Sequence, residues 1–121
     1  MIYGIGIDLA SITRVEKACG KEGFLRRVYS EKEIGLYRGD AARLAANFAA
    51  KEAFSKALGT GVRGFSMNEV SVCRDGLGKP FYEFSGKAEA IMKEAGLTAF
   101  LSLTDEGDSA AAVCVLEKNG I

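Results

Sequence analysis

The chain has 121 residues, 48% hydrophobic and 26% charged, with 16 basic and 16 acidic side chains. Length and composition are typical of one soluble globular domain, residues 1–121, that is long enough to bury a core. A net charge of zero argues against non-specific nucleic-acid binding, and no apolar run approaches the roughly 20 residues of a membrane span.

The residue inventory also restricts the chemistry. Histidine is absent, which excludes Ser-His-Asp and Cys-His catalysis and histidine-rich zinc sites. The cysteines, Cys19, Cys73 and Cys114, are odd in number and widely spaced, unlike a disulfide framework or a metal site. This use of cysteine is typical of a reducing cytoplasm, which is the expected location. The start of the chain has no basic leader, so we expect no signal peptide. Catalysis would depend on carboxylates, lysines, hydroxyls or a hard metal ion.

The first predicted element is a strand over residues 1–10, MIYGIGIDLA. Bulky side chains alternate with Gly4, Gly6 and Asp8, as in a strand with two different faces. Glycine inside a strand commonly marks the close approach of another backbone or of a ligand. One face of this strand is therefore bare at two positions and ends in a carboxylate.

A helix is predicted next, over SITRVEKACG at 11–20. Thr13 and Glu16 have the spacing of a capping box, and Gly20 is a stop signal. Basic residues gather from here onward, against Glu16 and Glu22: Arg14, Lys17, Lys21, Arg26 and Arg27. They form either a mixed, solvated helix surface or a docking surface for an acidic partner, which charge would steer.

Two further helices are predicted before the middle of the chain. SEKEIGLYRG, at 30–39, begins with a capping box of Ser30 and Glu33. The longest helix extends over about residues 41–58, and Gly59 stops it. Its small-residue face, suited to close packing on a sheet, contains Ala45, Ala49 and Ala53.

The long helix also carries the strongest candidate chemistry. Phe48, Glu52 and Lys56 share one stripe because they are four residues apart. The ordinary interpretation is a solvated ion pair worth a few tenths of a kcal/mol. The functional alternative makes Glu52 a ligand for a hard cation and Lys56 a point charge for a phosphate. Asp8, otherwise a turn residue, would add the second carboxylate of a magnesium site.

The end of the long helix is rich in glycine. Gly59, Gly61 and Gly64 match the G-x-G-x-x-G pattern literally. The dinucleotide-binding fingerprint requires a strand before these glycines and a helix after them, whereas here a helix comes first, which excludes it. Two interpretations are left: an ordinary helix C-cap, or a turn whose free backbone N–H groups hold an anion.

The second half of the chain predicts strands. Residues 69–84 have the pattern of a hairpin, residues 86–96 that of a short amphipathic helix, and residues 99–117 that of a second hairpin. The acidic run TDEGD at 104–108 has too few ligands for a calcium loop and is interpreted as a polar hairpin tip. The whole pattern predicts one compact α+β domain, an antiparallel sheet packed with one long and several short helices.

Two motifs together resemble a known family. GIGIDL at 4–9 and FAAKEAFSKALGTG at 48–61, supported by DGLGKP at 75–80, are similar to motifs of the holo-acyl-carrier-protein synthases, small bacterial members of the 4'-phosphopantetheinyl transferase superfamily. The resemblance implies the fold of that superfamily and transfer of 4'-phosphopantetheine from coenzyme A to a serine of acyl carrier protein. Adenosine 3',5'-bisphosphate would be released, and the holo carrier would serve fatty acid biosynthesis.

The resemblance also implies roles for matched positions. Asp8 and Glu52 look like the family's magnesium ligands, with manganese as an alternative ion, and Glu52 is the candidate base, directly or through a metal-held water. Lys56 matches a lysine that contacts the coenzyme A phosphates near the reaction centre. The remaining matches are Phe48, Gly59, Thr60, Gly61, Lys79 and Pro80 for the coenzyme, and Arg14, Lys21 and Arg27 for the acidic carrier protein. Members of the family are typically homotrimers with active sites between subunits.

Two positions depart from the family pattern. Asn47 replaces an arginine of many relatives, so one phosphate or intersubunit contact would be lost or supplied elsewhere. Many relatives also carry a histidine around Asp105, and this chain has none. A mechanism that needs a histidine near the coenzyme is thereby disfavoured, and a scheme of carboxylates and a metal is favoured.

Two other functions compete with the enzyme. A non-catalytic domain that binds coenzyme A or another nucleotide would use Lys56 and the glycine turn but would need neither Asp8 nor a metal. A structural oligomerisation module would use the glycine and alanine faces only to pack subunits. In such a module, replacing Asp8 or Glu52 with alanine would be nearly neutral.

Overall fold

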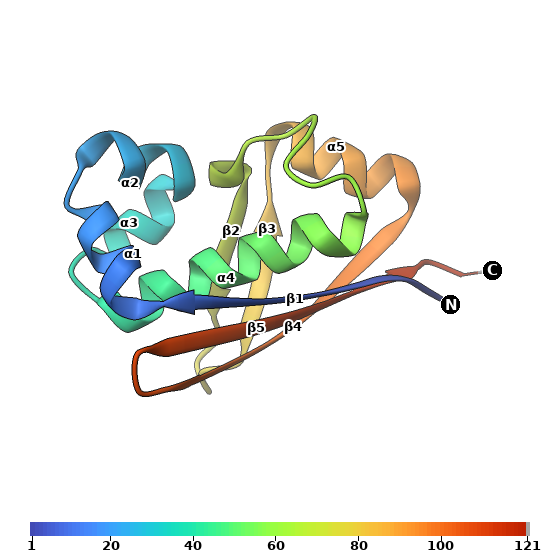
Figure 1. The fold of residues 1–121 in the computed structure, drawn as a ribbon. Helices are drawn as coiled ribbons and strands as arrows, with labels where there is room; N and C mark the ends of the chain where they lie inside the picture. Colours follow the sequence, from blue (N-terminus) through green and yellow to red (C-terminus); the bar gives the residue numbers. More distant parts are fainter. Residues whose placement is uncertain (121) are drawn as a thin grey trace.

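The computed structural model describes residues 1–120, in which two antiparallel sheets enclose one long helix (Figure 1). The elements are, in chain order, β1 (Ile2–Ser11), α1 (Ile12–Cys19), α2 (Glu22–Val28), α3 (Glu31–Tyr37), α4 (Ala41–Leu58), the 3-10 turn η1 (Met67–Glu69), β2 (Val70–Arg74), β3 (Pro80–Phe84), α5 (Gly86–Ala95), β4 (Leu97–Glu106) and β5 (Ser109–Lys118). The predicted α+β class with antiparallel pairing is confirmed.

Helix α4 is packed between a three-stranded sheet of order β1-β5-β4 and the two-stranded hairpin β2-β3. Helices α1 to α3 gather at the N-terminal end of α4, and α5 lies toward its other end (Figure 1). The two ends of the chain lie together, because the backbone N–H of Lys118 donates to the Met1 carbonyl oxygen at 2.9 Å. Within residues 1–120, α4 covers one face of the three-stranded sheet, and no helix covers the other face (Figure 1).

Close contact between α4 and β1 explains the two glycines of the first strand. A Cβ atom at Gly6 would lie 1.9 Å from the carbonyl oxygen of Ala53, and one at Gly4 would lie 1.9 Å from that of Ala57. Ala49 and Ala53 are fully buried on the facing side of the helix. The expected approach of another backbone to the bare face of this strand is confirmed.

Replacing Gly6 with alanine should therefore destabilise the fold by about 3 kcal/mol, because the new methyl group has to push the backbone of α4 away from β1. The midpoint and slope of urea unfolding measure this change. Gly35→Ala in α3 is the matched control, since nothing lies within 4 Å of its added methyl group. Equal unfolding midpoints for Gly6→Ala and the unchanged protein would contradict the close packing.

The start of α1 differs from the prediction. The capping box of Thr13 and Glu16 is wrong, because β1 extends to Ser11 and the helix begins immediately after it. Ser11 is the N-cap, and its hydroxyl accepts the backbone N–H of Arg14 at 3.2 Å. Thr13 instead lies in the first turn of α1 and contacts Asp108 of the distant β4-β5 turn.

Helix α2 is absent from the sequence prediction. It has seven residues, buries Leu25 and Val28, and follows Lys21, whose side chain makes no capping hydrogen bond. A short helix without a capping residue has no local start signal, so tertiary packing determines it. The Ser30–Glu33 capping box, the stop of α4 at Gly59, both hairpins and α5 are all as predicted.

No helix within residues 1–120 combines the length and the apolar character that crossing a lipid bilayer requires.

A buried ion pair fastens α4 to α3 and β2. Lys51 and Glu33 are both inaccessible to solvent, with 2.7 Å between Lys51 Nζ and Glu33 Oε1. The same ammonium donates to the carbonyl oxygens of Met67 and Val70. Asn47, one turn earlier on α4, donates to Glu33 Oε2 at 2.9 Å. These contacts fix the rotation of α4 about its own axis, because they hold the side of the helix opposite its alanine face.

Candidate active site

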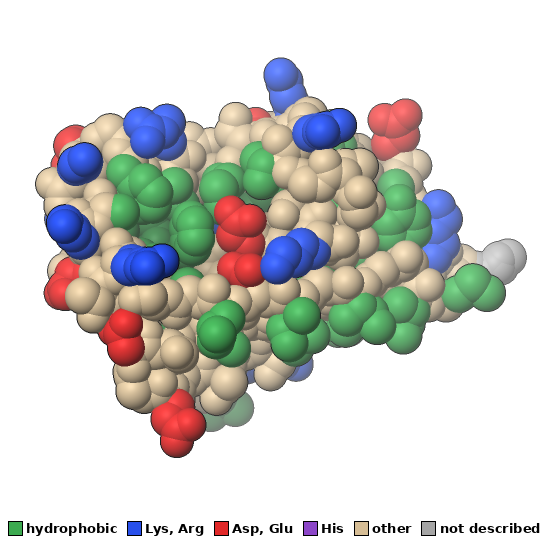
Figure 2. Space-filling view, viewed as in Figure 1, with side chains coloured by type: hydrophobic (Ala, Val, Ile, Leu, Met, Phe, Trp, Pro, Cys, Tyr) green, Lys and Arg blue, Asp and Glu red, His purple; other side chains and the backbone are tan. Residues whose placement is uncertain are grey.

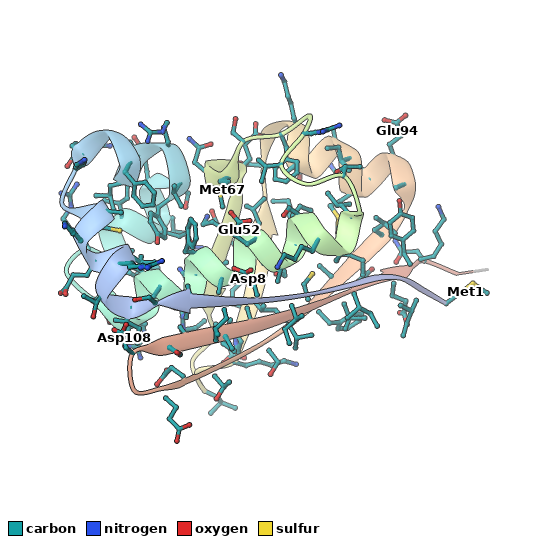
Figure 3. The ribbon with its side chains drawn as sticks, viewed as in Figure 1. Met1, Asp8, Glu52, Met67, Glu94 and Asp108 are labelled. Carbon is teal, nitrogen blue, oxygen red and sulfur yellow. The ribbon has the colours of Figure 1, made fainter. Side chains whose placement is uncertain are left out.

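Asp8, Glu52 and Lys56 come together at the surface where α4 crosses β1; Figure 3 labels the two carboxylates. Lys56 Nζ donates to Asp8 Oδ1 at 2.9 Å and to the carbonyl oxygen of Ile7 at 3.1 Å. The short side chain of Asp8 can take part only because the glycines before it bring β1 against the helix. Three residues that the sequence separates by up to 48 positions thus form one cluster.

The solvated ion pair between Glu52 and Lys56, one of the two interpretations of this stripe, is absent from the described residues. Among residues 1–120, Lys56 pairs with Asp8, and no ion pair joins it to Glu52. The Glu52 carboxylate accepts no hydrogen bond from the described residues, although it is half-buried. Glu52 is therefore held close to charged neighbours with its oxygens available.

Electrostatics at the cluster favour a bound cation. Burial raises the pKa of Glu52, and the negative charge of Asp8 raises it further, while Lys56 partly offsets both. The hydrogen bond to Asp8 raises the pKa of Lys56. Two carboxylates that repel each other are stabilised by a positive charge shared between them.

The donor set fits one class of metal ion. Within residues 1–120 no group of three or more His, Cys, Asp or Glu side chains could hold a metal. Zinc sites use three or four protein ligands, often histidine and cysteine. Magnesium is commonly held by one or two carboxylates and takes its other ligands from water and phosphate oxygens. Two carboxylates beside a lysine match magnesium together with a phosphorylated substrate.

Apolar surface lies on both sides of the cluster. A cleft of about 460 Å³ is lined by Ile7, Asp8, Leu9, Lys56 and Ala111 on the sheet side. On the side of α1 and α2, the half-buried rings of Phe24 and Phe48 lie 6.2 Å apart. Figure 2 shows hydrophobic side chains there beside the acidic pair, with basic side chains around them. This surface would admit a ligand with a charged group and a long, less polar chain.

The predicted carrier-binding residues lie at the α1-α2 end of the molecule. Arg14 is on α1, Lys21 precedes α2, and Arg27 is on α2; all three are exposed. Within the described chain none of the three forms an ion pair, whereas Arg26 is paired with Glu22 at 2.8 Å. Their charges are therefore available to an acidic partner.

The glycine turn is first of all a helix cap. Gly59 has a φ of 85° and donates its N–H to the carbonyl oxygens of Ser55 and Lys56, so this N–H is not free for an anion. Gly61 also has a positive φ, of 67°, and its carbonyl accepts the hydroxyl of Thr60 at 3.1 Å. The turn is exposed and begins three residues after Lys56, where α4 ends.

Lys79 and Pro80 are not brought to this cluster. They lie where the β2-β3 loop enters β3, and Figure 1 shows this loop at the lower edge of the molecule, away from the C-terminal end of α4. The backbone N–H of Lys79 donates to Asp75 Oδ1 at 2.9 Å, within the loop itself. The residues predicted to bind coenzyme A therefore do not all lie together within one chain.

The two departures from the family pattern lie in different environments. Asn47 is fully buried and accepts a hydrogen bond at 2.9 Å from Arg74 Nη2 of β2, so a guanidinium reaches this position from another element. Asp105 is exposed on β4. Asp108, which the sequence pattern does not distinguish from the rest of the acidic run, makes several hydrogen bonds to the start of α1.

Comparison with known proteins agrees with this geometry. Residues 4–114 match the model of the 4'-phosphopantetheinyl transferase superfamily. A holo-[acyl-carrier-protein] synthase of Lachnoclostridium phytofermentans is 42% identical over 118 residues, 97% of each chain. The crystal structure of the synthase from Neisseria meningitidis has a TM-score of 0.90 at 36% identity, covering 98% of this chain and 100% of that one. The synthase from Bacillus anthracis in complex with coenzyme A (3',5'-ADP) has a TM-score of 0.82 at 34% identity, covering 98% and 99%.

Proposed function

This chain belongs to the 4'-phosphopantetheinyl transferase superfamily, and we infer from this that it transfers 4'-phosphopantetheine from coenzyme A to a serine of acyl carrier protein. The products are the holo carrier, which serves fatty acid biosynthesis, and adenosine 3',5'-bisphosphate. The observation that carries this function is the convergence of Asp8, Glu52 and Lys56 in a chain that matches these synthases along nearly its whole length. We propose that residues 1–121 act as one transferase domain.

We propose that Asp8 and Glu52 hold Mg²⁺, which Mn²⁺ can replace. The raised pKa of Glu52 and the lack of a hydrogen-bond donor to its carboxylate within residues 1–120 support this assignment. When bound, the ion supplies positive charge to the diphosphate of coenzyme A and polarises the reacting phosphorus. Asp8 is hydrogen-bonded to Lys56, and this bond keeps the lysine ammonium beside the position proposed for the diphosphate.

Lys56 and Glu52 have separate roles in the proposed mechanism. The serine oxygen attacks the phosphorus that bears the pantetheine arm, and the bond from that phosphorus to the bridging oxygen breaks. Lys56, whose side chain is half-exposed beside Asp8, stabilises the negative charge that develops on the leaving bisphosphate. We propose that Glu52, directly or through a metal-held water, accepts the serine proton, because its carboxylate lies in the cluster and accepts no hydrogen bond within residues 1–120.

The coenzyme-binding residues support a site shared between subunits. Phe48, Gly59, Thr60 and Gly61 flank Lys56 along α4 and its exit, and we propose that they contact coenzyme A. Lys79 and Pro80 lie on a different edge of the chain. If they also contact the coenzyme, they do so from a neighbouring copy, which supports a homotrimer with active sites at the subunit interfaces.

The open face of the three-stranded sheet supports the same assembly. Side chains of β1 and β4 on this face are apolar and between 49% and 67% exposed: Tyr3, Ile5, Ile7, Leu9 and Phe100. Monomeric proteins rarely leave so contiguous an apolar surface uncovered. This face also includes the cleft beside Asp8 and Lys56, so a second copy packed here would help to close the site.

Replacing Ile5 with aspartate should convert the trimer to monomers and remove most activity, because a buried, unpaired charge opposes association. Sedimentation velocity gives the mass of each species. Leu36→Asp on α3 is the matched control, since Leu36 is 58% exposed and Ile5 is 60% exposed. An active unchanged protein that sediments as a monomer would refute the trimer.

The proposed partners are coenzyme A and an acidic carrier protein that docks on Arg14, Lys21 and Arg27. These exposed side chains, without ion pairs in the described part of the chain, support the docking surface. We propose a cytoplasmic location, which the free thiols of Cys19, Cys73 and Cys114 support because reducing compartments keep thiols unpaired.

The mass of apo-acyl carrier protein after incubation with this protein, coenzyme A and Mg²⁺ tests the function. We expect the carrier to gain the mass of one phosphopantetheine, and we expect no gain when a chelator removes the metal. An unmodified carrier, after several carriers are tried with folded protein, would leave a domain that binds coenzyme A without catalysis. A gain that persists in the chelator would remove the metal from the mechanism.

A further inference from the structure

Asp108, in the turn between β4 and β5, is exposed but extensively hydrogen-bonded. Its Oδ2 accepts the hydroxyl of Ser11 at 2.6 Å, and its Oδ1 accepts the backbone N–H of Thr13 at 2.9 Å and the hydroxyl of Thr13. Its own carbonyl oxygen accepts the N–H of Ile12 at 2.8 Å. Figure 3 labels Asp108 below the point where α1 begins. One residue thus joins the β4-β5 turn to three consecutive residues at the β1-α1 junction.

The contacts are specific to this carboxylate. Asp105 and Glu106 belong to the same acidic run and are equally exposed, but within residues 1–120 their side chains accept no hydrogen bond and form no ion pair. The hydrogen bonds from Ser11 and Thr13 lower the pKa of Asp108. Hydrogen bonds to an ionised acceptor are stronger than neutral ones. The polar hairpin tip expected from the sequence therefore contains one residue with a distinct structural role.

The junction that Asp108 holds connects two parts of the proposed site. β1 carries Asp8, and α1 follows β1 directly, without a loop, and carries Arg14. The N–H groups at the start of α1 are divided between two acceptors, since Ser11 takes that of Arg14 and Asp108 takes those of Ile12 and Thr13. When the Asp108 side chain is removed, the hydrogen bonds left at the start of α1 are the Ser11 cap and the bond from the Ile12 N–H to the backbone carbonyl oxygen of residue 108, so the contacts that hold Thr13 are lost.

We propose that Asp108 is a positioning residue for the carrier protein. It fixes the basic helix α1 relative to the strand that presents Asp8, so that a carrier docked on Arg14 delivers its serine to the reaction centre. This inference rests on the proposed function, in which α1 receives the carrier. Asp108 contacts neither coenzyme A nor the carrier in this role; it acts through Ser11, Ile12 and Thr13.

Separate KM values for the carrier and for coenzyme A test the proposal. Asp108→Ala should raise the KM for apo-acyl carrier protein by about tenfold, because the side-chain hydrogen bonds from Ser11 and Thr13 to the Asp108 carboxylate are lost while the Ser11 cap stays. The KM for coenzyme A should stay unchanged, because Lys56 and the end of α4 lie away from the turn. Asp108→Asn keeps an acceptor for the Thr13 N–H and should give a smaller rise. Asp105→Ala, in the same hairpin, should change neither constant.

Either of two results with Asp108→Ala would overturn the proposal. One is an unchanged carrier KM in Asp108→Ala, and another is an equal rise in both KM values, which would indicate a general loss of structure. If Asp108→Ala does not fold, Asp108→Asn decides between the same outcomes. Arg14→Ala separates the inference from the proposed function. If Arg14→Ala raises the carrier KM and Asp108→Ala does not, only the role of Asp108 is overturned. An unchanged carrier KM in Arg14→Ala removes α1 as the docking surface and the inference with it.

Discussion

Replacing Glu52 with glutamine should reduce transfer to the carrier protein by about a thousandfold or more, because one change would remove both the proposed metal ligand and the proposed general base. Glutamine has nearly the same shape as glutamate, so the packing of α4 against β1 is kept. The protein should remain folded and should still bind coenzyme A through Lys56 and the glycine turn. The rate of mass gain of the carrier, at several Mg²⁺ concentrations, measures the loss.

Stability provides a second readout for the same variant. Burial and the charge of Asp8 raise the pKa of Glu52 in the folded protein above its ordinary value. In the metal-free protein the ionised carboxylate therefore opposes folding at pH values above this raised pKa, and the opposition disappears below the ordinary pKa. Glu52→Gln should be at least as stable as the unchanged protein at neutral pH, and any difference should vanish in acid.

The control for Glu52→Gln is Glu94→Gln on α5, an exposed carboxylate far from the cluster (Figure 3). It should retain full activity. Asp8→Asn should resemble Glu52→Gln, and the double variant should be little worse than either single one, since the two carboxylates act as a unit. Transfer by Glu52→Gln within tenfold of the normal rate would refute its role and would favour a structural interpretation of the cluster.

The convergence of Asp8, Glu52 and Lys56 could be predicted because every step in it follows from local periodicity. Alternation in β1 places Asp8 on the face that contains Gly4 and Gly6, and the 3.6-residue period of α4 places Glu52 and Lys56 on one stripe. Small residues on both elements permit the close approach that joins them. The resemblance to the family supplied the chemistry, which the periodicity alone left open between an ion pair and a metal site.

Features that depend on long-range contacts could not be predicted in the same way. Asp108 is separated from Thr13 by 95 positions, and no periodicity links a hairpin tip to a distant helix start. The position of Lys79 depends on how the β2-β3 hairpin is placed. The burial of Asn47 depends on a hydrogen bond from Arg74 of β2. A charged Lys51 would also be expected at the surface, since lysine is seldom fully buried without a partner.

Replacing Glu33 with alanine should destabilise the protein by about 3 to 5 kcal/mol, because it leaves the Lys51 ammonium buried without its counter-charge. Glu33 and Lys51 are both fully buried, and their hydrogen-bonding capacity is satisfied. Lys51 Nζ donates to three acceptors. The two oxygens of Glu33 accept hydrogen bonds from Lys51, Ser30 and Asn47. Folded domains of this size are stable by about 5 to 15 kcal/mol, so the variant should retain only a small margin. Urea unfolding at low temperature measures it.

A double-mutant cycle shows whether the pair, rather than either side chain, is responsible. Glu33→Leu combined with Lys51→Met should recover only part of the loss, because the unpaired charge is gone while the Asn47 amide and the Val70 carbonyl oxygen each lose a partner. The exposed pair Lys32–Glu83, 2.8 Å apart, is the matched control, and Glu83→Ala should change stability by less than about 1 kcal/mol. Equal effects of Glu33→Ala and Glu83→Ala would show that the buried pair is not a stabilising contact. Since Lys51 precedes Glu52 on α4, loss of the pair should also loosen the proposed metal site at Glu52, so that the expected activation by Mg²⁺ weakens before the protein unfolds.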